Sequence, residues 1–381
     1  MKNMTFVLAP DSFKESMTAK EVCCAMEKGF RQVFPQADFI HVPMADGGEG
    51  TMQSLIDATR GTVYTLTVTG PLGAPVQASY GIMGDGEVAV IEMASASGIH
   101  FVNARTKNPL LTTTYGTGEL ILACLDKGIR KIILGIGGSA TNDGGAGMAQ
   151  ALGARFFDAN DQPLAPGGGA LEHLRRIDIT GLDPRLSGVD IQVACDVTNP
   201  LCGEFGASAV FGPQKGATPE MVRRLDAGLA HYADVIRDQL DKEVATQPGA
   251  GAAGGLGAGL MAFTHCTLRK GIDIVLEFSG LADKLVGADF CITGEGRIDA
   301  QTQFGKTPYG VARAAKALGV PVIAVSGCVG EGIESLYDIG IDAVFGIIPR
   351  ADSIDALLQE GPDNMAIACE NIGRLLRIAR P

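Results

Sequence analysis

The stretch "GIGGSATNDGGAG", residues 135–147, contains six glycines and directly follows the apolar run "KIIL". Such a run is typical of a strand buried on both faces of a parallel sheet. A strand that ends in so much bare backbone predicts either a tight turn or an anion site, because backbone N–H groups can close around a phosphate where bulky side chains are missing.

The segments on either side of this stretch predict two different sheets. Near the N-terminus, "TFVLAP" is a strand, Thr18 and Glu21 form a capping box that starts a helix, and "DFIHVPM" is a second strand. Residues 63–105 contain three strands with short turns, which predicts a mixed or antiparallel sheet. From about residue 288 the alternation of strand and helix returns. The pattern predicts an α/β fold in which one doubly wound domain is built from both chain ends around an inserted second α/β domain.

Composition excludes several classes of protein. Of the 381 residues, 46% are hydrophobic and 19% charged, which allows a sizeable core. The net charge of −12 argues against a nucleic-acid partner, because phosphate backbones require basic surfaces. Nine scattered cysteines without a C-x-x-C pair indicate free thiols in a reducing compartment. No run is long enough for a membrane span or a signal peptide, so we expect a cytoplasmic protein with no membrane partner.

Five loops with charged or hydroxyl side chains follow predicted strands. In parallel α/β sheets, ligands bind outside the carboxyl ends of the strands, so these loops are the candidate binding segments. They are "DSFKES" (11–16), "ADGGEGT" (45–51), "GGSATND" (137–143), "DVTNPL" (196–201) and "GEGRID" (294–299). Any one of them is an ordinary turn, but five in one chain favour a site.

The charged residues in and near these loops are those that phosphoryl transfer requires. That reaction needs cations and a divalent metal to hold the developing charge, and a carboxylate to orient the attacking hydroxyl. The candidate cations are Lys14, Lys215, Arg297 and Lys306, and the candidate carboxylates are Asp46, Glu49, Asp143, Asp196, Glu295 and Asp299. The alternative is that several of them pair with one another in salt bridges.

Two generic motifs carry less weight. Gly135-x-Gly137-x-x-Ala140, with Asp158 further on, fits the dinucleotide fingerprint, but Gly249-x-Gly251-x-x-Gly254 fits its glycine part as well. The segment "AQTQFGKT" (300–307) fits a relaxed phosphate-loop pattern, yet six residues separate it from the strand "DFCIT". We expect neither motif to define the function.

Seven ordered segments together resemble the bacterial glycerate kinase family, of the glyoxylate- and glucarate-pathway class. They are "APDSFKES", "PMADGGEGT", "GIGGSATNDGGAGMAQALGA", "ACDVTNPL", "FGPQKGAT", "PGAGAAGGLGAGLMAF" and "ITGEGRIDAQTQFGK", and they span essentially the whole chain. The resemblance implies an ATP-dependent kinase that phosphorylates D-glycerate with Mg²⁺, giving 2-phosphoglycerate. It also implies a discontinuous flavodoxin-like domain (1–65 and 286–381), an inserted α/β domain with a mixed sheet (66–285), and an active site in the cleft between them.

We assign roles to the matching residues as a hypothesis. Arg297 and Lys14 bind the carboxylate of glycerate and the transferring phosphoryl group. Asp46 or Asp196 orients the nucleophilic hydroxyl, and the other helps to place Mg²⁺. The nucleotide is bound by Gly137, Gly138, Ser139, Thr141 and Lys215, and glycerate by Ser12, Glu295 and Asp299 together with Arg297.

Three questions stay open at this point. An NAD-dependent oxidoreductase built on Gly135–Ala140 and a non-catalytic metabolite-binding protein are the alternative functions. The sequence does not distinguish phosphorylation at C2 from phosphorylation at C3 of glycerate. It also leaves the oligomeric state open, including a homo-oligomer.

Overall fold

The computed structural model describes residues 3–379 and divides into two compact units. Unit 1 combines the residues up to Arg60 with those from Gly271 onward, and unit 2 comprises Gly61–Lys270. A discontinuous domain with a second α/β domain inserted into it is therefore the observed arrangement along the chain. Among residues 3–379, no helix combines the length and the apolar character that crossing a membrane requires.

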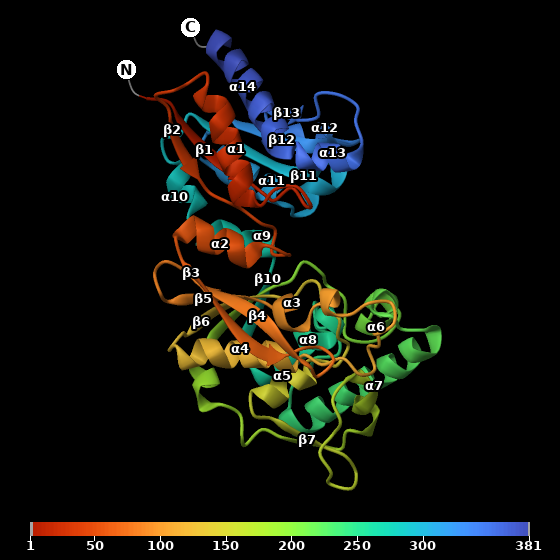
Figure 1. Cartoon of the computed structure of the whole chain (residues 1–381). Helices are drawn as coiled ribbons and strands as arrows, with labels where there is room; N and C mark the ends of the chain where they lie inside the picture. Colours follow the sequence, from red (N-terminus) through yellow and green to blue (C-terminus); the bar gives the residue numbers. More distant parts are fainter. Residues whose placement is uncertain (1–2, 380–381) are drawn as a thin grey trace. The chain divides into compact units, whose positions relative to one another are not determined.

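Unit 1 contains a five-stranded, fully parallel sheet (Figure 1). Its strand order, β13-β12-β11-β1-β2, places the third strand of the unit next to the first, which is the flavodoxin-like order. The strands are β1 (Thr5–Pro10), β2 (Asp38–His41), β11 (Phe290–Ile298), β12 (Val322–Val329) and β13 (Ala343–Gly346). The order reverses between β1 and β11, so the loops that follow these two strands lie at the topological switch point where such sheets bind ligands.

Helices cover both faces of this sheet. Phe6, Leu8 and Ile292 point to the face on which α1 and α14 pack, while the alternating residues Val7 and Cys291 are equally buried on the opposite face. The helices are α1 (Ala19–Arg31), α2 (Thr51–Thr59), α9 (Gly271–Phe278), α10 (Leu281–Leu285), α11 (Thr307–Ala317), α12 (Glu334–Asp338), α13 (Ile354–Gln359) and α14 (Gly361–Ala379). The predicted capping box of Thr18 and Glu21 is present at the start of α1.

Unit 2 contains a six-stranded mixed sheet with the order β10-β9-β6-β5-β4-β3. The strands from β10 to β5 run parallel, and β4 and β3 add an antiparallel edge, as expected for residues 63–105. The strands are β3 (Thr62–Thr69), β4 (Pro75–Ile82), β5 (Val88–Glu92), β6 (Lys131–Gly135), β9 (Asp190–Ala194) and β10 (Cys266–Arg269). A separate small pair joins β7 (Arg155–Phe157) to β8 (Arg176–Asp178).

The helices of unit 2 include one long surface helix and several short ones. Thr218 caps α7, and Pro219 opens it, as the sequence predicts. The glycine-rich segment after residue 248 forms α8, which is interrupted by left-handed backbone at Ala253, Gly254 and Gly255. The helices are α3 (Ala94–Ser97), α4 (Tyr115–Asp126), α5 (Ala146–Ala151), α6 (Ala207–Phe211), α7 (Pro219–Leu240) and α8 (Ala252–Phe263).

The boundaries of the units differ from the sequence-based ones at 65/66 and 285/286. The structure places them at 60/61 and 270/271, because α9 and α10 belong to unit 1. Gly310 of α11 admits the side chain of Ile272 so closely that a Cβ at Gly310 would lie 2.3 Å from Ile272 Cγ1. Lys284 of α10 also donates to the carbonyl of Ala58 in α2.

Candidate functional site

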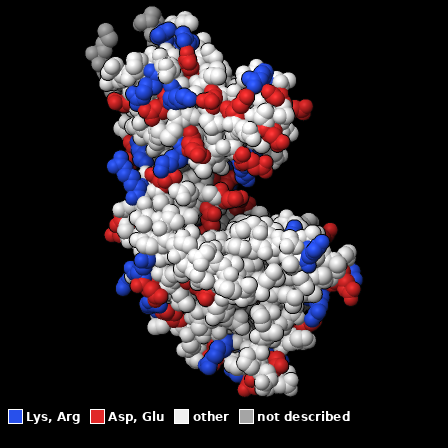
Figure 2. Space-filling view, viewed as in Figure 1, with Lys and Arg blue, Asp and Glu red and all other residues white. Residues whose placement is uncertain are grey.

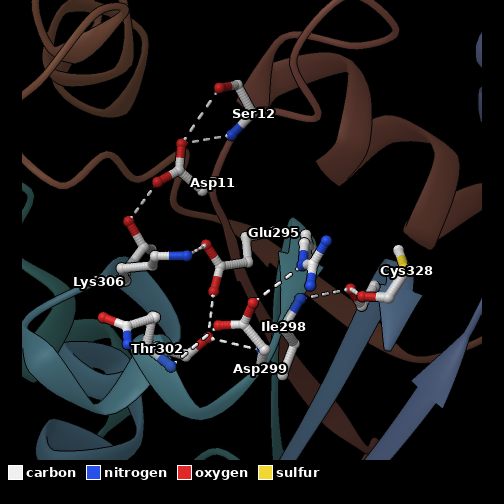
Figure 3. Close-up of polar contacts among 12 residues, drawn as sticks. Asp11, Ser12, Glu295, Ile298, Asp299, Thr302, Lys306 and Cys328 are labelled. Carbon is white, nitrogen blue, oxygen red and sulfur yellow. Dashed lines mark hydrogen bonds and ion pairs between the residues drawn. The ribbon is translucent and has the colours of Figure 1, made fainter. Parts of the chain in front are cut away.

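The first candidate cluster lies at the switch point of unit 1, where β1 ends beside Gly294 of β11. Pro10 and Gly294 are paired across these strands, so Asp11 and Glu295 follow at neighbouring positions. Asp11 Oδ2 accepts a hydrogen bond of 2.5 Å from the hydroxyl of Thr307 at the start of α11. Glu295 Oε1 accepts one of 2.7 Å from the hydroxyl of Thr302, and Lys306 Nζ lies 3.5 Å from Glu295 Oε2 (Figure 3).

The environment disfavours charge on both acids. Burial raises the pKa of Asp11 to about 6, opposed by the Thr307 hydroxyl and reinforced by repulsion from Asp46. Burial also raises the pKa of Glu295 to about 7, opposed by Thr302 and Lys306 and reinforced by Asp11. Carboxyl groups with raised pKa values at a switch point are typical of ligand and proton chemistry.

The structure brings several predicted residues of unit 1 to this place. The backbone of Lys14 runs beside Gly296, so the "DSFKES" and "GEGRID" loops are neighbours. Ser12 donates to Asp11 through both its N–H and its hydroxyl. Asp46 follows β2 and interacts electrostatically with Asp11, while its Oδ1 accepts from the N–H of Gly48.

Arg297 and Asp299 are paired with each other in this structure. Arg297 Nε donates to Asp299 Oδ2 at 2.9 Å, and the arginine side chain is 66% exposed. Asp299 also accepts from the N–H of Gln301 and caps the short helical turn Ala300–Phe304 (Figure 3). The hydrogen bond from the backbone N–H of Gln301 lowers the pKa of Asp299, and the one from the Arg297 side chain adds to this effect. Asp299 therefore has a structural role, and the parts of both residues in glycerate binding stay predictions.

The second candidate cluster is the glycine-rich loop of unit 2, which follows β6. Gly137 and Gly138 are exposed, and a Cβ at Gly137 would meet no atom within 4 Å. Within residues 3–379, the N–H groups of Gly137, Gly138 and Ser139 donate to no protein acceptor. The loop is held in place through other groups: Ile99 N–H donates to the Gly138 carbonyl, and Ala140 N–H donates to the Ser97 carbonyl. Unpartnered N–H groups in an exposed turn form an anion-binding concavity.

Two buried charged side chains, Lys215 and Asp143, support this loop from inside the unit. Lys215 Nζ donates to Ser139 Oγ at 2.7 Å and to the Thr141 carbonyl at 2.6 Å. Burial lowers the pKa of Lys215 to about 7, partly opposed by the negative charge of Asp143. Asp143 accepts from the N–H and hydroxyl of Thr114 and from the N–H groups of Gly145 and Gly147. Burial raises the pKa of Asp143, and these bonds oppose the shift.

Two other predicted residues of unit 2 have different surroundings. The side chain of Thr141 is fully buried, and its hydroxyl lacks a partner within the described residues. Asp196 is exposed in the loop that follows β9. The roles of both residues stay predictions.

The structure corrects the interpretation of the two generic motifs. The dinucleotide fingerprint requires a helix that opens at the glycines, whereas α5 begins only at Ala146, after a long loop. The segment 300–307 does follow a strand closely, because β11 extends to Ile298 rather than ending at "DFCIT". Its residues Thr302, Lys306 and Thr307 reach the two acids of unit 1.

Sequence reasoning missed Asp11, Thr302 and Thr307. Asp11 had a usable signal, because it is the first residue after the first strand of the parallel sheet. The two threonines had none, since their roles depend on the short helical turn Ala300–Phe304 and on the start of α11.

The fold and these clusters define a two-unit α/β protein with an acidic strand-end site and an anion-binding loop. The sequence matches the glycerate kinase family over residues 6–377. A glycerate kinase of Haemophilus influenzae is 56% identical over 373 residues, covering 98% of this chain and 99% of the relative. A glycerate 2-kinase of Escherichia coli is 52% identical over 375 residues, covering 98% of each chain. The chain therefore belongs to the glycerate kinase family, as the resemblance predicts.

A solved structure agrees with this assignment. A crystal structure of a protein from Salmonella typhimurium LT2, assigned as glycerate kinase 2, has a TM-score of 0.92 and 51% sequence identity, with complete coverage of both chains. The predicted α/β fold class is confirmed. The family and the long loop before α5 do not favour the oxidoreductase alternative.

Proposed function

We propose that this protein is a glycerate kinase that transfers the γ-phosphoryl group of ATP to a hydroxyl of D-glycerate and gives 2-phosphoglycerate. The observation that carries the proposal is the family match over residues 6–377, which includes both polar clusters. The 2-phosphate product is favoured by the 52% identical glycerate 2-kinase. A non-catalytic binding protein is disfavoured, because the acids of unit 1 and the anion loop of unit 2 are both intact.

The chemistry of ATP binding is supplied by the glycine-rich loop. The N–H groups of Gly137, Gly138 and Ser139 bind phosphate oxygens, with Thr141 and Lys215 behind them. Because the loop holds these donors in place before ATP binds, they need little reorganisation to stabilise the negative charge that develops on the phosphate oxygens during transfer.

The chemistry of glycerate binding is assigned to the acidic cluster and its cations. Arg297 and Lys14 bind the carboxylate of glycerate and the transferring phosphoryl group. The hydroxyl groups of glycerate are contacted by Ser12, Glu295 and Asp299. In the reaction, the glycerate oxygen forms a bond to the γ-phosphorus, the bond from that phosphorus to ADP breaks, and the hydroxyl proton passes to a carboxylate. Asp46 or Asp196 is that carboxylate.

The donor set suits Mg²⁺ without forming a metal cage. Among residues 3–379, no group of three or more His, Cys, Asp or Glu side chains is placed to hold a metal. Mg²⁺ in kinases is typically held by one or two carboxylates together with substrate phosphates, and Asp46 or Asp196 provides such a ligand. When bound, the ion neutralises charge on the phosphate oxygens. A cytoplasmic location is part of this proposal, because all nine cysteines are free thiols.

The test is identification of the product by NMR after incubation with D-glycerate, ATP and MgCl₂. We expect 2-phosphoglycerate and an equal amount of ADP. Formation of 3-phosphoglycerate would refute the assigned hydroxyl, and ADP release that does not depend on glycerate would refute the kinase itself. Size-exclusion chromatography with light scattering would show in the same sample whether the protein is a homo-oligomer, which stays a prediction.

A further inference from the structure

Lys215 belongs to the short helical turn Pro213–Lys215 and is only 2% exposed. Its Nζ donates to Ser139 Oγ and to the Thr141 carbonyl, and both acceptors belong to the glycine-rich loop. A cation so completely covered by protein does not reach a ligand at the outer surface of the loop. Its direct effect is therefore on the loop itself.

The contact with Lys215 determines what the hydroxyl of Ser139 can do. A lysine ammonium has only donors, so Ser139 Oγ is the acceptor in this hydrogen bond. The proton of Ser139 then remains to be donated, and it meets no acceptor within residues 3–379. Ser139 is 8% exposed and directly follows the exposed Gly137 and Gly138, so its donor lies next to their unpartnered N–H groups.

We propose that Lys215 is a positioning residue of the nucleotide site: by donating to Ser139 Oγ and the Thr141 carbonyl, it fixes the Ser139 hydroxyl as a donor to a phosphate oxygen. The inference rests on the proposed function and refines the role predicted for Lys215 there. The groups that contact the phosphate are the loop's N–H groups and the Ser139 hydroxyl, and the ammonium acts through them.

Packing alone does not account for a lysine at this position. Burying a cation carries a desolvation cost that an apolar side chain of the same length avoids. The nearby Asp143 compensates this cost only in part, because its carboxylate is already engaged by Thr114, Gly145 and Gly147. The two short hydrogen bonds to the loop are the specific feature that a methionine could not reproduce.

The experiment is a double-mutant cycle on the full-length protein with ADP as the probe. We measure ADP affinity by calorimetry for the parent, Ser139→Ala, Lys215→Met and the double variant. Each single variant is expected to bind ADP about 10- to 100-fold more weakly, the effect of losing a hydrogen bond to a charged group. If Lys215 acts through Ser139, Lys215→Met has no further effect once the serine is gone, so the double variant binds no more weakly than Ser139→Ala alone.

Lys107→Ala is the matched control. Lys107 Nζ donates to the carbonyl of Gln214, one residue before Lys215, and within residues 3–379 it has no hydrogen bond to Ser139 or Thr141. This variant removes a lysine that binds the same turn from another segment of the chain, and we expect its ADP affinity to equal that of the parent. A loss as large as that of Lys215→Met would mean that the turn as a whole, rather than the Lys215–Ser139 contact, controls binding, and would overturn the proposal.

Two further outcomes would overturn it. Effects that multiply in the double variant would show that Lys215 and Ser139 act independently. An ADP affinity of Ser139→Ala within twofold of the parent would exclude the serine donor, and this measurement does not require Lys215→Met to fold. Failure of the proposed function would give a different result. A parent protein that binds ADP but forms no phosphorylated glycerate would refute the kinase assignment, while the double-mutant cycle would still test the role of Lys215 in ADP binding.

Discussion

The two units place ionisable groups in or behind the loops that follow buried parallel strands, but with opposite exposure. In unit 1, Asp11 and Glu295 remain partly accessible and have raised pKa values. In unit 2, Asp143 and Lys215 are fully enclosed, and the exposed groups of the glycine-rich loop, at Gly137 and Gly138, are bare backbone. Figure 2 shows a parallel contrast on the viewed face: charges of both signs are dense on unit 1, whereas a broad area of unit 2 carries none.

The charged side chains therefore have different functions in the two units. The charged side chains of the unit 1 cluster are accessible to a ligand. In unit 2, Asp143 and Lys215 instead support the glycine-rich loop, whose backbone N–H groups are accessible. Substitutions in the unit 1 cluster should therefore change catalysis more than stability. Substitutions of the buried Asp143 or Lys215 in unit 2 should change stability as well.

The largest effect is expected from Arg297→Ala in unit 1. A cation at the transferring phosphoryl group contributes roughly 10³–10⁵ to the rate, so kcat should fall by that order. Its salt bridge to Asp299 is exposed and contributes little to folding. The measurement is the initial rate of ADP formation with D-glycerate, together with a thermal unfolding curve. Arg313→Ala, an exposed arginine on α11 of the same unit, is the control, and a kcat of Arg297→Ala within a few-fold of it would remove Arg297 from the site.

The next effect is on the stability of unit 2. Asp143→Ala leaves the hydroxyl and N–H of Thr114 and the N–H groups of Gly145 and Gly147 without their acceptor. It also removes the negative charge beside the buried Lys215. We expect the free energy of unfolding to fall by about 3 kcal/mol or more, because an uncompensated buried charge remains. Urea denaturation followed by circular dichroism measures it, and an unchanged midpoint would show that Asp143 is not the support described here.

Asp11→Asn in unit 1 is expected to raise the free energy of unfolding, by less than Asp143→Ala lowers it. The pKa of Asp11 is raised from 3.8 to about 6, so the folded state favours the protonated acid, and its contribution to stability is lost as pH rises from about 4 through 6. Asparagine has no such penalty. In Mg²⁺-free buffer at pH 8, the variant should be more stable by on the order of 1–2 kcal/mol, with the difference vanishing near pH 4.

The check is a series of urea denaturation curves for both proteins between pH 4 and pH 8. Lower stability of Asp11→Asn at pH 8 would contradict the burial effect. The same variant should lose activity, so a gain in stability with a loss of kcat is the expected signature of a functional acid.

The smallest effect is expected from Gly137→Ala. The added methyl group enters open space, and the backbone there needs no positive φ, so stability should change by less than about 0.5 kcal/mol. The methyl group would nevertheless stand beside the phosphate donors, and we expect KM for ATP to rise several-fold. Gly188→Ala is the control, because a Cβ there also meets nothing within 4 Å and the site lies in another turn of unit 2. Equal KM values for the two variants would argue against the loop as the phosphate site.

Much of the fold was predictable because local signals agreed with it. The capping box at Thr18, the Thr218–Pro219 start of α7 and the apolar strands all appear as expected. The boundary that the sequence placed near residue 286 was not predictable, because the assignment of α9 to unit 1 depends on the contact between Ile272 and Gly310. That contact joins two segments whose proximity no local pattern reports.

The candidate sites were predictable at the level of loops but not of contacts. The glycine-rich loop was recognised from its composition, and its exposed N–H groups agree with that interpretation. Lys215 was predicted as a direct nucleotide ligand, but its burial depends on how the turn Pro213–Lys215 packs against the loop. The surroundings of Asp11 likewise depend on a distant residue: burial raises its pKa, and the opposing hydrogen bond comes from Thr307, which lies 296 positions away in the chain.

The discontinuous origin of unit 1 has a consequence for biosynthesis. The central strand β1 (Thr5–Pro10) leaves the ribosome long before its neighbour β11, which begins only at Phe290. Until then, the first sixty residues carry unpaired strand edges and an uncovered aromatic core around Phe6, while the contiguous Gly61–Lys270 segment is able to fold as soon as it emerges. A nascent chain arrested before β11 should therefore contain a protease-resistant middle and a vulnerable beginning.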